Sequence, residues 1–372
     1  MDLSVHPCKT EDIRVTPVLQ QTAYWSEVKK LQGVSSAAFS VSVTSDELTV
    51  TAATGDSSED LLVLFQEIGD GLSIAYVPYG PELDPGPENF GPFLEELSET
   101  LRGFLPAGCI LIRYDLLWRS PWSEEDDRFD ENGNWLGPPE QRSQEIRINF
   151  PTHNWNLRKA GSNILPADTV FIDLSRSEDE LLDRMRAKTR YNVRLAQRRG
   201  VEVISADRTR LDTWYDLYRE TCSRNGINLH GRFFFRAVAD AATAFDDNSA
   251  DMELLVARAD GEDLAAMFLV STGKRATYLF GASATKKRNL MPTYALQWEA
   301  IQRAKHKGCR EYDMFGVSPS ADKAHPMYGL YRFKTGFGGY IFHRMGCWDY
   351  PLDPAVYDQL RTLEMNSTGY HV

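Results

Sequence analysis

The order of predicted elements repeats along the chain. In the first half, runs rich in Val, Leu, Phe and Thr alternate with turn-forming residues and predict a strand meander. These runs lie at 36–44, 47–53, 61–66 and 72–77, before a predicted helix at 90–104 and an apolar strand at 109–117. In the second half, three strands between Glu253 and Ser283 precede a helix at 292–307 and a strand at 310–315. The recurrence indicates one mixed α/β (α+β) unit used twice.

The length of the chain agrees with two units. Its 372 residues are too many for a domain with one hydrophobic core. They suit two domains of about 150–200 residues each. We place the domains at 1–165 and 166–372. The first opens with a predicted helix at 18–30, which carries Lys29 near its end.

Net charge, cysteine content and apolar runs limit the binding partners and the cellular compartment that the chain suits. A net charge of −12 repels nucleic acid overall, so a polyanion must meet a local basic patch. The five cysteines include no C-x-x-C pair, which argues against zinc or a disulfide framework and favours a reducing cytoplasm. No apolar run approaches the roughly 20 residues that cross a bilayer, and the N-terminus lacks a signal-peptide core. We expect a cytoplasmic protein without a metal site.

One segment of the first half has no periodicity. Residues 118–142 are acidic and rich in turn formers, which predicts a long surface loop. Such a loop is either a lid or a solvated insertion, and we favour the insertion.

The best local signal begins at Ser177. Ser177 and Glu180 form a capping box, acidic residues fill the first turn, and Gly200 follows the run. These signals predict one helix over 178–199. Gly200 then leads through a short strand to the next predicted helix, at 209–224.

Cations recur every fourth residue along this predicted helix. Arg186, Arg190, Arg194 and Arg198 share one side, and Lys188 adds to them. Such a stripe suits the phosphates of a nucleic acid or nucleotide. The alternative is a solvated face, but it weakens because acidic partners at i±4 are missing.

The segment from His325 to Gly339 combines a short helix with three glycines. Lys334 lies between Phe333 and Phe337, so its amine is partly desolvated and is a candidate to stabilise negative charge on a reacting carbonyl. The alternative is a surface lysine at a helix end. The glycines at 336, 338 and 339 let the backbone approach either another strand or a ligand.

The order of elements resembles the GNAT acyltransferase fold. An ordinary GNAT enzyme holds the coenzyme A pyrophosphate in a loop of the type R/Q-x-x-G-x-G/A. The corresponding segment here, G-A-S-A-T-K-K-R-N-L, does not match that pattern. The mismatch argues against acetyl-CoA as the donor.

Four motifs resemble the Fem-type peptidoglycan bridge-forming aminoacyltransferases, the FemABX family. They are R-A-K-T-R-Y-N-V-R-L-A-Q-R-R-G-V, Y-L-F-G-A-S, E-Y-D-M-F-G-V and H-P-M-Y-G-L-Y-R-F-K-T-G-F-G-G. The family has two tandem GNAT-like domains and moves an amino acid from aminoacyl-tRNA to the side-chain amine of the peptidoglycan stem peptide. The resemblance implies two partners, aminoacyl-tRNA and UDP-MurNAc-pentapeptide or its lipid-linked form. It also implies peripheral membrane contact through a lipid-linked precursor, and no cofactor.

The resemblance also implies residue roles. Lys334, beside Phe333, resembles the family's lysine that stabilises charge on the ester carbonyl or the leaving ribose oxygen. Lys29 resembles the lysine that meets the diphosphate of the precursor, and Asp115 and Tyr278 lie where precursor contacts are expected. The arginine stripe would then face tRNA, with the second domain on the aminoacyl-tRNA side and the first on the precursor side.

Some positions depart from the family pattern. His230 and Phe234 stand where an arginine and a tyrosine are frequent, so the phosphate contact is weaker, pH-sensitive or taken over by Arg232. Tyr79 stands where a basic residue is common. The long two-helix arm that some members insert in the second domain is missing, because Gly200 leads through a short strand to the next helix. These departures bear on the identity of the substrate more than on the type of reaction. Two other functions stay open as well: an acyl-CoA-dependent N-acyltransferase acting on a small molecule or sugar, and a non-catalytic RNA- or nucleotide-binding protein.

Overall fold

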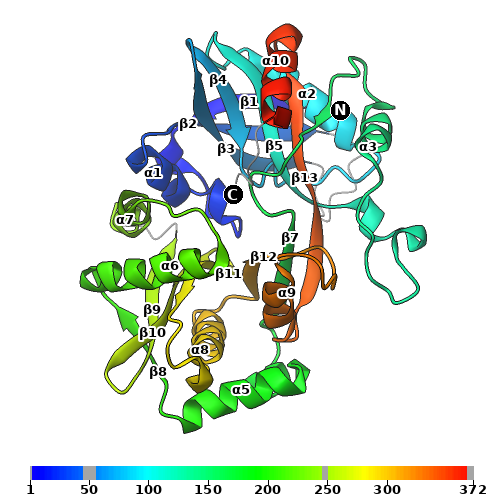
Figure 1. The fold of residues 1–372 in the computed structure, drawn as a ribbon. Coiled ribbons are helices and arrows are strands. Elements are labelled where there is room, and N and C mark those ends of the chain that lie inside the picture. Colours follow the sequence, from blue (N-terminus) through cyan, green and yellow to red (C-terminus); the bar gives the residue numbers. More distant parts are fainter. Residues whose placement is uncertain (1, 45–55, 245–249, 367–372) are drawn as a thin grey trace. The chain divides into compact units, whose positions relative to one another are not determined.

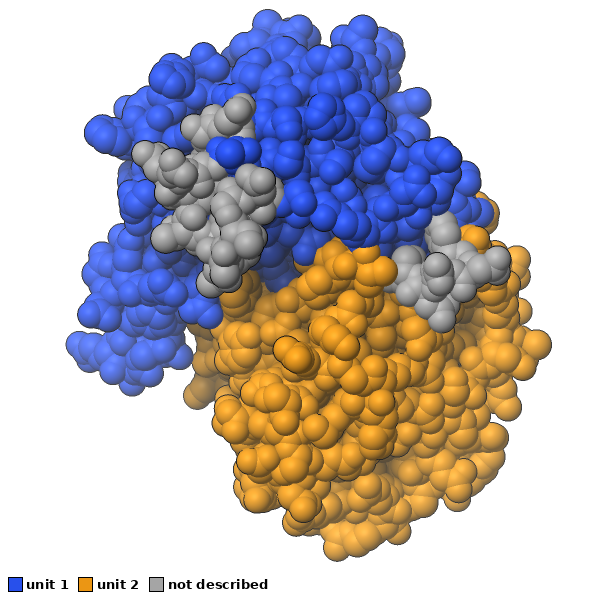
Figure 2. Space-filling view, turned by 180° about the vertical axis from the view of Figure 1, so that it is seen from behind, with its two compact units in different colours: residues 1–14, 20–167, 343–372 blue, residues 15–19, 168–342 orange. Residues whose placement is uncertain are grey.

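A computed structural model describes residues 2–44, 56–244 and 250–366. The chain divides into two compact units (Figure 2). The first comprises 1–14, 20–167 and 343–372, and the second comprises 15–19 and 168–342. The first unit passes to the second at 167/168, close to the 165/166 boundary placed from the sequence. The C-terminal segment from His343, however, returns to the first unit instead of staying in the second.

The first unit is built on a mixed sheet (Figure 1). Its strands, in sheet order, are β1 (Asp2–Cys8), β2 (Ser35–Thr44), β3 (Asp56–Gly69), β4 (Leu72–Val77), β5 (Cys109–Arg119) and β13 (Tyr340–Pro351). The short β6 (Arg158–Lys159) pairs with β13. β4 and β5 are parallel, and the other neighbours are antiparallel. The predicted strand at 47–53 lies outside the described residues.

Helices cover both faces of this sheet. The helices of the unit are α1 (Ala23–Leu31), α2 (Phe90–Arg102), α3 (Gln141–Asn149) and α10 (Pro354–Asn366). Phe93 of α2 shares one apolar cluster with Ala75, whereas Tyr357 of α10 shares another with Ile74. Ile74 and Ala75 are neighbours in β4 and point to opposite faces, so the two helices pack on opposite sides.

The segment predicted as a surface loop over 118–142 differs from that expectation. β5 extends to Arg119, α3 begins at Gln141, and two short 3₁₀ turns lie at Pro121–Ser123 and Asp126–Arg128. Trp122 and Trp135 are buried, and the Trp135 Nε1–H donates to the Trp122 carbonyl at 3.2 Å. The two indoles anchor the segment, so it is not simply a solvated insertion.

The second unit repeats a mixed sheet. Its strands, in sheet order, are β7 (Asp168–Asp173), β12 (Glu311–Gly316), β11 (Arg275–Ser283), β10 (Glu262–Thr272), β9 (Asp251–Ala259) and β8 (Glu202–Ala206). Only the pair β11–β12 is parallel among these neighbours. The predicted D-G turn between β9 and β10 is confirmed, since Asp260 and Gly261 both have positive φ.

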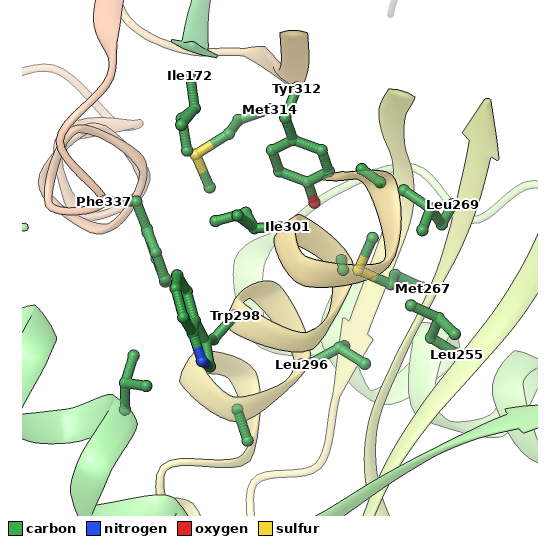
Figure 3. Packing of buried hydrophobic residues seen from close by; sticks show 14 of the residues in the cluster. Ile172, Leu255, Met267, Leu269, Leu296, Trp298, Ile301, Tyr312, Met314 and Phe337 are labelled. Atoms are coloured by element: carbon green, nitrogen blue, oxygen red, sulfur yellow. The ribbon is translucent and has the colours of Figure 1, made fainter. Parts of the chain in front are cut away.

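The core of the second unit lies between the sheet and one long helix. The helices are α4 (Glu178–Arg184), α5 (Ala187–Arg198), α6 (Leu211–Asn225), α7 (Arg232–Ala241), α8 (Pro292–His306) and α9 (Tyr328–Thr335). Ile301 and Trp298 of α8 pack with Tyr312 and Met314 of β12 and with Phe337 (Figure 3). Pro292 occupies the first turn of α8, as predicted.

The predicted single helix over 178–199 is wrong. The capping box of Ser177 and Glu180 is present, but the helix stops at Arg184, and Met185 and Arg186 are extended. The Arg186 N–H donates to the carbonyl of Gly336 at 2.9 Å. A tertiary contact thus replaces the helical hydrogen bond and divides the run into α4 and α5.

No long arm interrupts the second unit. From Gly200 the chain runs through β8 to α6, as predicted, and within the described ranges no helix exceeds the 15 residues of α6 and α8. None of the helices in those ranges is long and apolar enough to cross a bilayer.

Candidate active site

The parallel strands of the second unit separate early. β11 and β12 pair only through residues 275–277 and 311–313. Just beyond, Phe280 on β11 and Phe315 on β12 both have positive φ, at 48° and 59°. Since side chains disfavour this conformation, both strands bend where they part. Backbone groups freed by the separation need other partners.

Lys334 supplies one such partner. Its side chain is buried, with 4% exposed, and its Nζ donates to the carbonyls of Phe315 at 3.1 Å and Gly316 at 2.6 Å. The amine lies 5.4 Å from the ring centre of Tyr278 on β11. This residue is therefore not the surface lysine of the alternative interpretation.

Burial changes the protonation of this amine. Desolvation lowers the pKa of Lys334 to about 7, and the nearby Asp313 carboxylate opposes the shift. Near neutral pH both forms are populated. The ammonium form can stabilise negative charge on an acyl oxygen, whereas the neutral form can accept a proton.

The residues next to Lys334 fix helix α9. Phe333 packs against Tyr294 and Phe337, with ring centres 5.1 Å and 5.3 Å away, so it contributes to the core. The glycines allow close approach of backbone rather than of a ligand. A Cβ on Gly338 would lie 2.6 Å from the carbonyl oxygen of Arg184, and one on Gly339 would collide with the carbonyl of Phe171.

Tyr278 depends on another glycine. A Cβ on Gly281 would overlap the Tyr278 hydroxyl, so only glycine there lets this side chain lie along β11. Burial raises the pKa of Tyr278 to about 12, which keeps its hydroxyl neutral at physiological pH.

His230 lies near the same strand through an aromatic chain. Its ring stacks on Phe234 at 4.8 Å, and Phe234 meets Phe280 of β11 at 5.7 Å. Arg232 is engaged elsewhere, because it pairs with Asp212 at 2.8 Å and lies over Tyr215 at 4.9 Å. The Arg232 guanidinium is thus already engaged by Asp212 and Tyr215 of the second unit.

The first unit carries a buried acid at the end of its own parallel strand pair, β4 and β5. β4 and β5 pair as far as Val77 and Tyr114, and Asp115 is the next residue of β5. Its Oδ2 accepts from the Tyr76 hydroxyl at 2.6 Å and from the Leu165 N–H at 2.9 Å. Burial raises the pKa of Asp115. Its Oδ1 is buried, and no N–H or O–H of the described residues donates to it.

Lys29 occupies the last turn of α1. The Thr22 hydroxyl caps this helix by accepting from the Trp25 N–H at 3.1 Å. The Lys29 amine donates to the Gln32 side chain at 3.1 Å and lies 5.2 Å from the Trp25 ring. Burial lowers its pKa.

A cation is also present beside Tyr79. The Arg344 guanidinium lies 4.4 Å from the Tyr79 ring centre, and the Tyr79 hydroxyl donates to the Pro166 carbonyl at 2.7 Å. Arg344 therefore places positive charge next to the position where the family pattern led us to expect a basic residue.

The predicted cation stripe lies on α5 and its N-cap. Arg186, Lys188, Arg194 and Arg198 are exposed. Arg190 is not free of acidic partners, because it lies 3.6 Å from Asp183 and also donates to two carbonyls of α4. Asp183 precedes Arg190 by seven residues, so this partner lies outside the i±4 spacing on which the sequence argument rested.

The structure groups the predicted residues by unit. The Lys334 amine lies close to the Tyr278 ring where β11 and β12 part. His230 precedes α7 and is linked to β11 through Phe234. Sequence reasoning missed Asp313, which lies in the E-Y-D-M-F-G run. An acidic residue inside an otherwise apolar strand was the available signal.

Similar proteins define the class. The crystal structure of FemX shares this fold, with a TM-score of 0.72 and 19% identity, covering 97% of this chain and 100% of that one. The family model for FemAB matches residues 14–260 and 241–365, so this chain belongs to the FemAB family.

Two curated relatives are similar to this chain in sequence. They are the lipid II:glycine glycyltransferases of Staphylococcus aureus strains USA300 and bovine RF122 / ET3-1, each 24% identical over 267 residues. The match covers 55% of this chain and 63% of each relative. This chain therefore spans less than two thirds of the length of those relatives.

Proposed function

We propose that this protein is an aminoacyltransferase that moves an amino acid from aminoacyl-tRNA to the stem-peptide amine of a peptidoglycan precursor. Membership of the FemAB family supports this reaction, as does the name of the S. aureus relatives. The observation that carries the proposal is the buried Lys334 amine held at the carbonyls of Phe315 and Gly316. A fixed, desolvated cation suits a reaction that develops negative charge on an acyl oxygen.

In the proposed reaction, the neutral amine of the stem peptide attacks the carbonyl carbon of the aminoacyl ester. A C–N bond forms while negative charge develops on the carbonyl oxygen. The ester C–O bond then breaks, and the ribose hydroxyl leaves with the proton that the attacking nitrogen gives up. Lys334 stabilises the charge on the carbonyl or leaving oxygen, an effect worth ~3–4 kcal/mol for a typical oxyanion donor.

The two substrates are assigned to different residues. We assign the precursor, as UDP-MurNAc-pentapeptide or its lipid-linked form, to Lys29, Asp115, Tyr278 and His230. The aminoacyl-tRNA is assigned to the cations of α5, since the net charge of −12 requires a local basic surface for a polyanion. An exposed Tyr191 with Arg198 5.8 Å from its ring adds a stacking surface there.

A transfer assay read by mass spectrometry tests this function. Purified protein is incubated with an acceptor, either UDP-MurNAc-pentapeptide or the lipid-linked precursor. Parallel reactions add charged tRNA, uncharged tRNA or acetyl-CoA as the donor. A precursor mass gain of one amino-acid residue that requires charged tRNA is the expected result. Acetylation from acetyl-CoA would establish the acyl-CoA alternative instead. Binding of uncharged tRNA with no transfer to any acceptor would indicate a non-catalytic RNA-binding protein.

A further inference from the structure

Strand β12 carries an irregularity at the point where Lys334 meets it. Against β7, Asp313 pairs with Phe171 but Gly316 pairs with Thr169, so β12 holds one extra residue. This is a β-bulge, and Phe315 within it has a φ of 59°. A left-handed phenylalanine is disfavoured by roughly 1–2 kcal/mol, so other contacts must hold it.

Asp313 provides those contacts. Its Oδ1 accepts from the Phe315 N–H at 2.8 Å, and the Thr169 hydroxyl of β7 donates to the same oxygen. The Asp313 side chain is buried, with 4% of the residue exposed. Tyr312 and Met314 point to the core against α8 (Figure 3), so Asp313 points to the other face of the sheet.

The bulge determines where the lysine amine lies. The carbonyls that accept from Lys334 Nζ belong to Phe315, whose N–H is held by the Asp313 side chain, and to Gly316, the next residue. A change at Asp313 therefore moves the two acceptors of the amine, although Asp313 need not touch the substrate.

The charge of Asp313 acts on the same amine. Of the groups around Lys334, Asp313 on β12 is the acid whose charge favours the ammonium form against burial. Tyr278 on β11 stays neutral, because burial raises its pKa to about 12. Arg332 on α9 lies over Tyr328, at 5.9 Å from that ring centre.

The geometry points to Asp313 as the positioning residue of this site: through the Phe315 bulge it fixes the Lys334 amine, and its charge favours the ammonium form of that amine. The role in catalysis rests on the proposed aminoacyl transfer. The effect on the Lys334 amine does not, and it can be measured without any substrate.

The test compares Asp313→Asn with Thr169→Val. Asparagine keeps an oxygen for the Phe315 N–H but removes the charge, whereas valine removes one hydrogen bond and leaves the charge. Lysine labelled with ¹³C at Cε reports the titration of each amine by NMR, and Lys334→Met identifies the Lys334 signal. The rate of transfer against pH is measured on the same proteins.

We expect the Lys334 titration midpoint to fall by about one pH unit or more in Asp313→Asn. The pH at which transfer declines should fall with it, and kcat at neutral pH should drop about tenfold. Thr169→Val should leave the midpoint in place. An unchanged midpoint in a folded Asp313→Asn protein would overturn the proposal. A shifted midpoint without transfer by the wild type would instead count against the proposed function alone.

A second variant covers the case in which Asp313→Asn does not fold. Asp313→Glu keeps the charge but displaces the carboxylate by one methylene. We expect its midpoint to stay near that of the wild type while kcat falls several-fold and KM is unchanged. Wild-type kcat in Asp313→Glu would show that the position of the carboxylate is unimportant and would contradict the proposal.

Discussion

The two units end their parallel strand pairs with groups of opposite charge. In the first unit, Asp115 follows the last pair of β4 and β5. In the second, the amine of Lys334 reaches the strands β11 and β12 from helix α9. Burial raises the pKa of the acid and lowers that of the amine, so both are driven towards their neutral forms.

The difference lies in how each group is supplied. Asp115 belongs to the strand itself, so its place follows from the sheet register. Lys334 comes from a separate helix whose docking depends on the glycines after it. The same strand separation can therefore present an acid or a base, depending on which neighbouring element reaches it.

Disturbing the docking of α9 should have the largest effect. Gly338→Ala places a Cβ 2.6 Å from the Arg184 carbonyl oxygen at a φ of 86°, so we expect a loss of about 3 kcal/mol or more in unfolding free energy. Gly329→Ala, within α9 and with open space around it, is the control and should stabilise by up to about 1 kcal/mol. Urea denaturation measures both. Equal stabilities would show that α9 is not held by this contact.

The buried amine should make stability depend on pH. In the unfolded chain Lys334 stays protonated up to its ordinary pKa of 10.5, whereas in the fold it loses its proton at about 7. Between these values the unfolded state binds more protons, so the free energy of unfolding rises with pH. From about pH 7 to about pH 9.5 the gain should be of the order of 3 kcal/mol.

The matched variant isolates this contribution. Lys334→Met removes the titrating group, so its free energy of unfolding should rise less than that of the wild type over the same pH range. Parallel pH dependences in the two proteins would mean that the amine is not desolvated in solution.

The acid of the first unit is tested by Asp115→Asn. Asparagine keeps an oxygen for Tyr76 and Leu165 but turns the free Oδ1 acceptor into an N–H donor. We expect the KM for the precursor to rise about tenfold, with aminoacyl-tRNA binding unchanged. Asp70→Asn, at an exposed turn with positive φ, is the control. A normal precursor KM would remove Asp115 from the site.

The smallest effect is expected on α5. Replacing Arg194 and Arg198 by glutamine should weaken tRNA binding several-fold and reduce the salt dependence of log K by about 1–2. Arg236→Gln, exposed on α7, should change neither. An unaltered salt dependence in the double variant would place tRNA on another surface.

Local signals in the sequence predicted most of the framework. The capping box at Ser177, the Asp260–Gly261 turn and Pro292 at the start of α8 specify structure through neighbouring residues, and the structure contains each of them. Strand β4 coincides with its prediction at 72–77.

Features fixed by distant contacts could not be predicted. The break between α4 and α5 depends on the Gly336 carbonyl, and Asp313 depends on Thr169, which is 144 residues away in the sequence. Helix α3 buries Gln144 and Asn149 on its inner side, so it lacks the apolar periodicity by which helices are recognised. The position of Lys334 beside Tyr278 likewise needed the fold.

A single-turnover transfer assay tests whether Lys334 stabilises the transition state. Wild-type protein and Lys334→Met are loaded with the same aminoacyl-tRNA and mixed with excess precursor, and Arg332→Met on the same helix is the control. We expect a transfer rate at least about 100-fold lower in Lys334→Met, with tRNA affinity and folding retained and the control near wild type. A wild-type rate in folded Lys334→Met would contradict the assignment of Lys334 as the group that stabilises the transition state.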